Sequence, residues 1–239
     1  MLMKAQKNIL KFKPEYTLFK ITSQLYCVEM PNAYDLAMLF VRYQEYYESP
    51  NPNVRNKSFV LEEYMRWYAT EGRNKDRNKH DSFSYPADFC GFNIPSYALD
   101  VVKTVKHKNM YDNLMKEIVK KVKKDLKEEN PELKKFYLIG CPKMDSDTLK
   151  HEISHGLYHL NSDYKVQADT LIEKLLSKKD IKKFIIALRT YHYCEEVMYD
   201  EMTAFMSTGE MHTIFPDVKT KKFKKHFKSY YENIEPKLI

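Results

Sequence analysis

Glycine and cysteine are scarce in this chain, which has five glycines and four cysteines among 239 residues. The cysteines lie far apart and form no CxxC pair. This spacing argues against a zinc ribbon or a small disulfide framework and favours free thiols in a reducing compartment. No apolar run approaches the roughly 18 residues that a membrane-spanning helix needs. The N-terminal residues 1–16 carry charges where a signal peptide has a continuous apolar stretch. We therefore expect a cytoplasmic protein.

Arginine is also scarce. Only six of the 40 basic residues are arginine, so the net charge of +7 comes from lysine. Arginine is the usual residue for bidentate recognition of phosphates and bases, and we expect no specific nucleic-acid partner. Hydrophobic residues make up 43% of the chain and aromatic residues 14%. A chain of this length and composition can bury a substantial core.

Hydrophobic periodicity and helix caps predict an α+β fold that is mostly helical. One or two strands are expected in residues 16–30, and another in the run KKFYLIGC at 134–141. Residues 71–95 are expected to form a polar loop and an irregular aromatic segment. Helices are expected over residues 32–48, 58–70, 96–129, 147–160, 163–177 and 180–208, the last ended by Gly209. We expect an N-terminal helical and β subdomain over 1–133 and a metal-binding subdomain over 134–239, within one compact unit.

The C-terminal segment 218–236 is predicted to form a basic amphipathic helix. Its apolar face carries Phe223, Phe227, Tyr230 and Ile234. Docking of this face on the body of the protein is the favoured interpretation. Weak contact of the lysines with an anionic surface is the alternative.

One stretch, LKHEISHGLYHLNSDY at 149–164, holds three of the eight histidines, and His151, Glu152 and His155 spell H-E-x-x-H. On a helix, His151 and His155 lie one turn apart, about 6 Å along the axis. Both imidazoles can therefore reach one zinc ion. Glu152 is rotated about 100° from His151, which places its carboxylate beside the metal. A carboxylate there can act as the general base of a hydrolytic site.

The helical wheel separates polar from apolar residues in this stretch. One arc carries Thr148, His151, Glu152, His155 and His159, and the opposite arc carries Leu149, Ile153, Gly156, Leu157 and Leu160. Gly156 allows another element to pack closely on the apolar arc. His159 lies about 12 Å further along the axis than His151, too far to share its metal. We assign it to the surroundings of the metal or to substrate contact, and a solvated or core-edge position without such a role is the alternative.

The third ligand is expected on the later helix that contains Glu195, Glu196, Asp200 and Glu201. Glu201 shares its stripe with Cys194, Val197, Ala204, Phe205 and Thr208, the side expected to pack inward. We predict Glu201, because zinc would compensate its burial and Ala204 would permit close helix packing. Glu195 is the main alternative, and Asp163 and Asp169 remain open.

Several side chains are candidates for stabilising an oxyanion or contacting substrate. Tyr199 and His192 are the two that we assign to the surroundings of the metal. Further possible oxyanion donors are Tyr158, Tyr191 and Tyr193.

HEISH at 151–155 and DEMTAF at 200–205 together resemble the zincin metallopeptidases. The metzincin branch requires a glycine and a third histidine where this chain has Tyr158 and Asn161. The gluzincin arrangement, with its third ligand from a glutamate on a later helix, is the closer likeness. The pair of motifs is also similar to small bacterial and phage metallopeptidases that cleave repressors. The resemblance covers residues 145–205.

The resemblance implies a zincin-like fold, in which a small sheet with an edge strand lies beside the active-site helix. That helix packs on a second, ligand-bearing helix. It also implies that the strand at 134–141 is the edge strand on which an extended substrate pairs. An interior strand is the alternative for this segment.

Two functions follow from these patterns. The first is a zinc-dependent metallopeptidase or amide hydrolase that acts on a peptide or protein, with Glu152 as general base. The second is a non-catalytic interaction or structural protein that retains the helix. A carboxylate beside an open coordination position favours catalysis, because structural zinc sites are closed.

Overall fold

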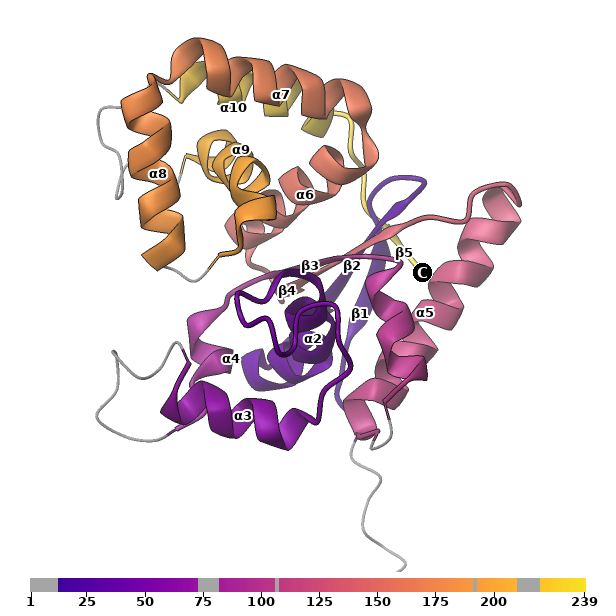
Figure 1. The fold of residues 1–239 in the computed structure, drawn as a ribbon. Helices are drawn as coiled ribbons and strands as arrows, with labels where there is room; N and C mark the ends of the chain where they lie inside the picture. Colours follow the sequence, from indigo (N-terminus) through magenta and orange to yellow (C-terminus); the bar gives the residue numbers. More distant parts are fainter. Residues whose placement is uncertain (1–12, 73–81, 106–107, 191–192, 210–219) are drawn as a thin grey trace, which may run out of the picture.

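Figure 1 shows a computed structural model of the protein, which describes residues 13–72, 82–105, 108–190, 193–209 and 220–239. A mixed sheet lies in the middle, with its strands in the order β3, β4, β2, β1, β5. The strands are β1 (Thr17–Lys20), β2 (Leu25–Met30), β3 (Phe92–Pro95), β4 (Tyr137–Pro142) and β5 (Lys237–Leu238). Strands β2 and β4 are parallel, and the other neighbouring strands are antiparallel.

Helices cover both faces of the sheet (Figure 1). The first group is α2 (Ala33–Glu48), α3 (Leu61–Thr70), α4 (Tyr85–Asp88), the 3-10 helix η2 (Ala98–Lys103) and α5 (Met110–Glu129). The second group is α6 (Ser146–Leu160), α7 (Ser162–Leu175), α8 (Lys178–Thr190), the 3-10 helix η3 (Glu195–Val197), α9 (Met198–Thr208) and α10 (Lys221–Tyr231). The expected α+β fold, mostly helical, is confirmed.

Strand β2 divides the core by the alternation of its side chains. Tyr26 and Val28 belong to the apolar cluster formed with α2, α3 and α5. Leu25 and Cys27 belong to the cluster on the other face, with α6. Successive side chains of a strand point to opposite faces, so one short strand supports both helical layers.

The strand expected at 134–141 is present, but its edge position is wrong and the interior alternative is confirmed. Residues 137–142 form β4, which pairs with β2 on one side and β3 on the other. On that side of the sheet the edge strand is β3, within the segment expected to be irregular, and β5 forms the other edge. All four residues of β3 are buried, so the polar alternation that marks a half-exposed strand is missing.

Two predicted helices were too long. The segment 96–129 contains η2 and then α5, which starts at Met110. Asn109 and Asp112 form a reciprocal capping box at that start, which gives α5 its own N-terminus. The segment 180–208 is likewise split, because Cys194 is extended between α8 and η3. Gly209 ends α9 as expected.

The C-terminal helix docks on the body, as expected. Phe223 and Phe227 of α10 are buried in clusters with residues of α9 and α6. Contact of its lysines with an anionic surface stays a prediction.

The subdomain division at residue 133 also stays a prediction. Strands from both sides of that residue belong to one sheet. In the described part of the chain, no helix combines the length and apolarity needed to span a membrane.

Candidate metal centre

Helix α6 carries the H-E-x-x-H motif and begins at a strong cap. The carboxylate of Asp145 accepts hydrogen bonds from the backbone N–H and the hydroxyl of Thr148, at 3.0 and 2.7 Å. Ile153 and Leu157 bury the apolar arc against the sheet. A Cβ added to Gly156 would lie 2.5 Å from Leu25 Cδ1, so this glycine lets α6 lie directly on β2. The close packing expected at Gly156 is confirmed.

His151 and His155 meet Glu201 at the contact of α6 with α9. The Nε2 atom of His151 lies 3.9 Å from Glu201 Oε2, and the Nε2 atom of His155 lies 3.6 Å from Glu201 Oε1. All three side chains are buried, and one ligand atom from each lies within 4.8 Å of the others. Two imidazole nitrogens and a carboxylate oxygen form a donor set that zinc favours, and metal–ligand distances of about 2.0–2.2 Å suit this spacing.

The hydrogen bonding of Glu201 also fits a metal. Its Oε2 atom is buried and accepts no hydrogen bond from the residues that the structure describes. A buried carboxylate oxygen without a donor is costly, whereas a cation would compensate it. The residues present therefore fit a divalent metal ion, and the site qualifies as a possible metal centre.

Asp200 supports His155 from the side opposite Glu201. Its Oδ1 atom lies 2.9 Å from His155 Nδ1, and its side chain is buried. The two atoms are close enough for an ion pair but do not have hydrogen-bond geometry. A carboxylate beside Nδ1 favours a proton on that nitrogen and leaves Nε2 directed at Glu201. The sequence groups Asp200 with the other carboxylates considered as the third ligand, and the structure places it beside His155 instead.

Burial and neighbouring charges shift the pKa values of the site in opposite directions. Burial, with a smaller contribution from His155, lowers the pKa of His151 well below its usual value. Burial also opposes protonation of His155, but the carboxylates of Asp200 and Glu201 outweigh it and raise the pKa of His155 well above the usual value. Burial raises the pKa of Glu201 despite the opposing effect of His155. The metal-free centre therefore retains protons that a metal would displace.

Glu152 is held by the strand at the sheet edge. Asn93 of β3 donates a hydrogen bond from Nδ2 to Glu152 Oε2 at 3.1 Å. Asn93 Oδ1 in turn accepts a hydrogen bond of 2.7 Å from the hydroxyl of Tyr137. Gly91 lies against the same carboxylate, since a Cβ there would sit 2.2 Å from Glu152 Oε1. The edge strand thus positions the predicted general base beside the ligands.

A cavity opens onto this arrangement. Its walls include His151 and Glu152 of α6 together with Phe205 of α9 and Tyr193. The ring of Phe205 contacts His151 edge-on, with ring centroids 4.8 Å apart. One ligand and the candidate base are therefore reachable from a cavity that accepts a small group.

The other carboxylates considered as ligands have different surroundings. Glu195 is exposed in η3, and its Oε1 accepts a 2.9 Å hydrogen bond from Arg189 Nε. Asp163 is exposed at the start of α7. Asp169 pairs with Lys165 and accepts a 2.8 Å hydrogen bond from the hydroxyl of Tyr158. Of the four carboxylates, Glu201 is therefore the one that lies with His151 and His155.

The predicted surrounding residues are dispersed. His159 lies at the exposed end of α6, with its ring 4.6 Å from that of Tyr137. Tyr199 lines a groove between α7 and α8. Tyr193 lines the cavity at the metal centre, whereas Tyr158 turns to Asp169. Tyr191 and His192 lie outside the described residues.

Sequence reasoning missed Gly91 and Asn93, both in the segment CGFNIP. A glycine one residue before a buried, strand-forming tetrapeptide was the available signal. Gly91 contacts Glu152, which lies 61 residues further along the chain. No local pattern in the sequence links the two residues.

Comparisons with protein-family models, with curated proteins and with solved structures find no match.

Proposed function

We propose that the protein is a zinc-dependent metallopeptidase or amide hydrolase of the gluzincin-like kind. The observation that carries this proposal is the position of Glu152. It is buried next to the His151, His155 and Glu201 group, is held by Asn93, and lines the adjoining cavity. Catalytic zinc sites combine three protein ligands with an open position and a nearby base.

His151, His155 and Glu201 would hold the ion, which when bound supplies a Lewis acid for a carbonyl group and for water. Glu152 would accept a proton from the attacking water and return it to the leaving amine. Asn93 and Gly91 keep its carboxylate close to the ligands. Tyr193, the one described member of the predicted oxyanion donors that lines this cavity, is our candidate for stabilising the developing charge.

In the non-catalytic alternative the motif either binds no metal or binds one for stability alone, and a structural metal predicts a closed site with four protein ligands. The described residues supply a group of three, and Glu152 is bound by Asn93 instead of joining it. A spare carboxylate beside three ligands supports hydrolysis over a purely structural role.

The experiment compares zinc-loaded wild type, Glu152→Gln and the exposed control Glu132→Gln on a mixed library of quenched fluorescent peptides. We expect Glu152→Gln to retain its zinc and to lose at least about 10²-fold in rate, the usual cost of lost proton transfer. Glu132→Gln should match wild type. Full activity in Glu152→Gln would remove its role as base. A zinc-loaded wild type that cleaves no member of the library would favour the non-catalytic alternative.

A further inference from the structure

An open groove follows helix α8, between this helix, the end of α7 and Tyr199 of α9. Figure 1 shows α8 at the left of the molecule, with α9 beside it. The groove offers about 610 Å³ of space, within the range of about 300–1,000 Å³ that is typical of sites for small ligands. Most of its lining residues are apolar or aromatic, and most of the others are basic.

The floor of the groove is apolar and partly open to solvent. Ile181, Ile185 and Tyr199 are half-buried and pack on the apolar cluster shared by α7, α8 and α9. Ile186, which lies next to them in the groove, is 50% exposed. A contiguous apolar surface with a polar rim marks a binding site, whereas single exposed apolar side chains do not.

The basic residues are distributed unevenly along α8. Lys178 and Lys182 are exposed in its first two turns, and neither forms an ion pair within the part of the chain that the structure describes. Arg189, in the last turn, donates a 2.9 Å hydrogen bond from Nε to Glu195 Oε1. The groove therefore has one basic end without a partner and one end whose charge is neutralised, with isoleucines between them.

These residues share one face of α8. Lys178, Lys182, Ile185 and Arg189 follow one another at steps of four, three and four, and Ile186 is next to Ile185. From Lys178 to Arg189 this face extends about 16 Å. An extended chain of 12 carbons is about 14 Å long, at about 1.3 Å per bond. The face therefore matches a single long acyl chain in length.

A long-chain carboxylate fits both the floor and the charge. Its acyl chain would cover the isoleucines, and its head group would meet Lys178 and Lys182. A cationic head group would be repelled by the same lysines. A partner helix with acidic residues on both flanks would bring one flank to Glu173 of α7, the acidic residue that lines the groove.

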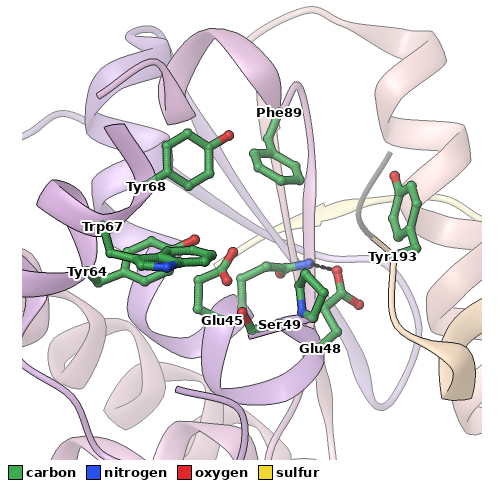
Figure 2. A pocket seen from close by; sticks show the side chains of 10 residues that line it. Glu45, Glu48, Ser49, Tyr64, Trp67, Tyr68, Phe89 and Tyr193 are labelled. Atoms are coloured by element: carbon green, nitrogen blue, oxygen red, sulfur yellow. Dashed lines mark hydrogen bonds between the residues drawn. The ribbon is translucent and has the colours of Figure 1, made fainter. Parts of the chain in front are cut away.

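The pocket at the end of α2 lacks this combination (Figure 2). Trp67 and other aromatic residues line it, and the Glu48 carboxylate there accepts a hydrogen bond from Gln44. No lysine or arginine is among the described residues that line this pocket. Trp67 is the single tryptophan of the chain, so its emission reports any ligand that enters this pocket instead of the groove.

We propose that the groove along α8 binds a long-chain carboxylate, with its chain on Ile181, Ile185 and Ile186 and its head group at Lys178 and Lys182. The inference is independent of the proposed hydrolase function, because none of the three candidate metal ligands lines this groove. Metal-free and zinc-loaded protein should therefore bind the carboxylate equally well.

Calorimetric titration of the full-length protein compares three amphiphiles below their micelle concentrations. We expect saturable binding of one dodecanoate. Octanoate should bind at least about 10-fold more weakly, because each buried methylene contributes a factor of up to about four. Dodecyltrimethylammonium has the same chain with the opposite charge and should also bind at least about 10-fold more weakly, since it replaces attraction to two lysines by repulsion. Trp67 emission should stay constant.

Matched variants test the two parts of the groove. Lys178→Gln/Lys182→Gln should weaken dodecanoate binding about 5-fold or more, whereas Lys179→Gln/Lys183→Gln, an equal change on the same helix outside the groove, should bind like wild type. Ile186→Asp should weaken binding at least about 10-fold. Val166→Asp, at a position 64% exposed on α7, is its control.

Several outcomes would overturn the proposal. These are no saturable binding of dodecanoate, equal affinity for dodecanoate and dodecyltrimethylammonium, or equal losses in the two pairs of lysine variants. Binding that changes Trp67 emission and is unaffected by Ile186→Asp would place the ligand in the other pocket. A helical peptide with a leucine stripe and glutamates that binds where dodecanoate does not would assign the groove to a protein partner. The comparison of amphiphiles on wild type needs no variant, so a folding defect in one variant leaves the test intact.

Discussion

At the scale of single residues, Asp200 has the clearest effect on the ligands without being one of them. Its Oδ1 atom lies 2.9 Å from His155 Nδ1, while His155 Nε2 faces Glu201. Asp200→Ala should weaken zinc binding about 10- to 100-fold, because carboxylates behind a histidine ligand orient the ring and raise its basicity. Competition with a zinc chelator measures this change. Glu196→Ala, at an exposed neighbouring position, is the control, and unchanged zinc affinity in Asp200→Ala would contradict the assignment.

Asn93 acts on Glu152 in a comparable way. Its removal in Asn93→Ala deletes the 3.1 Å hydrogen bond to Glu152 Oε2. We expect zinc content to stay at the wild-type level and kcat/KM to fall about 10-fold or more, as for other groups that orient active-site residues. Asn113→Ala, exposed on α5, controls for a general effect of losing an amide. A wild-type rate in Asn93→Ala would mean that Glu152 needs no such support.

The candidate ligands could be predicted because each is marked by the pattern of its own helix. The spacing of His151 and His155 on a helix brings both rings to one ion, and the stripe containing Glu201 and Ala204 indicated the inward side of the later helix. Glu201 does lie with the histidines. Asn93 and Gly91 were not predictable, because their contact with Glu152 depends on where an edge strand meets a distant helix.

At the scale of elements, the close contact of α6 with β2 determines how far the helix that carries the candidate ligands lies from the sheet. Gly156→Ala would place a Cβ 2.5 Å from Leu25 Cδ1. In an exposed helix this substitution is stabilising by about 0.5–1 kcal/mol, through helix propensity. Here we expect overpacking to lower the free energy of unfolding by about 1–3 kcal/mol. Urea unfolding measures the difference, and a stabilised variant would contradict this packing.

Element boundaries show where sequence patterns fail. The apolar periodicity of residues 96–129 continues across two helices, and only the Asn109–Asp112 capping box marks the new start. Both residues are visible in the sequence, but the continuous apolar periodicity favoured one long helix over two. Strand β3 was missed because it is four residues long, buried throughout and ends in Pro95. Strand β3, and not the segment 134–141, forms the sheet edge. The order in which strands pair depends on tertiary contacts, which the local sequence pattern does not reveal.

At the scale of the whole molecule, the candidate metal centre and the residues around it come from both halves of the chain. Gly91 and Asn93 precede the predicted boundary at residue 133, whereas the three ligands follow it. Strands from both halves share the sheet that aligns them. The centre therefore depends on the folded molecule as one unit, and zinc bound to it should stabilise the whole fold.

Protons and metal compete for this centre. The carboxylates of Asp200 and Glu201 outweigh burial and raise the pKa of His155, and burial raises the pKa of Glu201. Both groups must lose their protons to bind zinc, so apparent zinc affinity rises with pH. If the pKa of His155 had its usual value of about 6.5, the rise in zinc affinity would level off above that pH. The raised pKa of His155 extends the rise through neutral pH. Chelator competition at about pH 6, 7 and 8 measures it, and a constant affinity between about pH 7 and 8 would contradict the raised pKa.

The central claim is that His151, His155 and Glu201 hold one zinc ion. The most direct measurement is the zinc content of the purified protein, determined by elemental mass spectrometry, for wild type, His151→Ala, His155→Ala and Glu201→Gln. Glu195→Gln, which alters the exposed partner of Arg189, is the matched control. We predict one equivalent of zinc in wild type and Glu195→Gln, and its loss in the other three variants. Near-zero metal in every protein, or zinc lost in Glu195→Gln and retained in Glu201→Gln, would contradict the account.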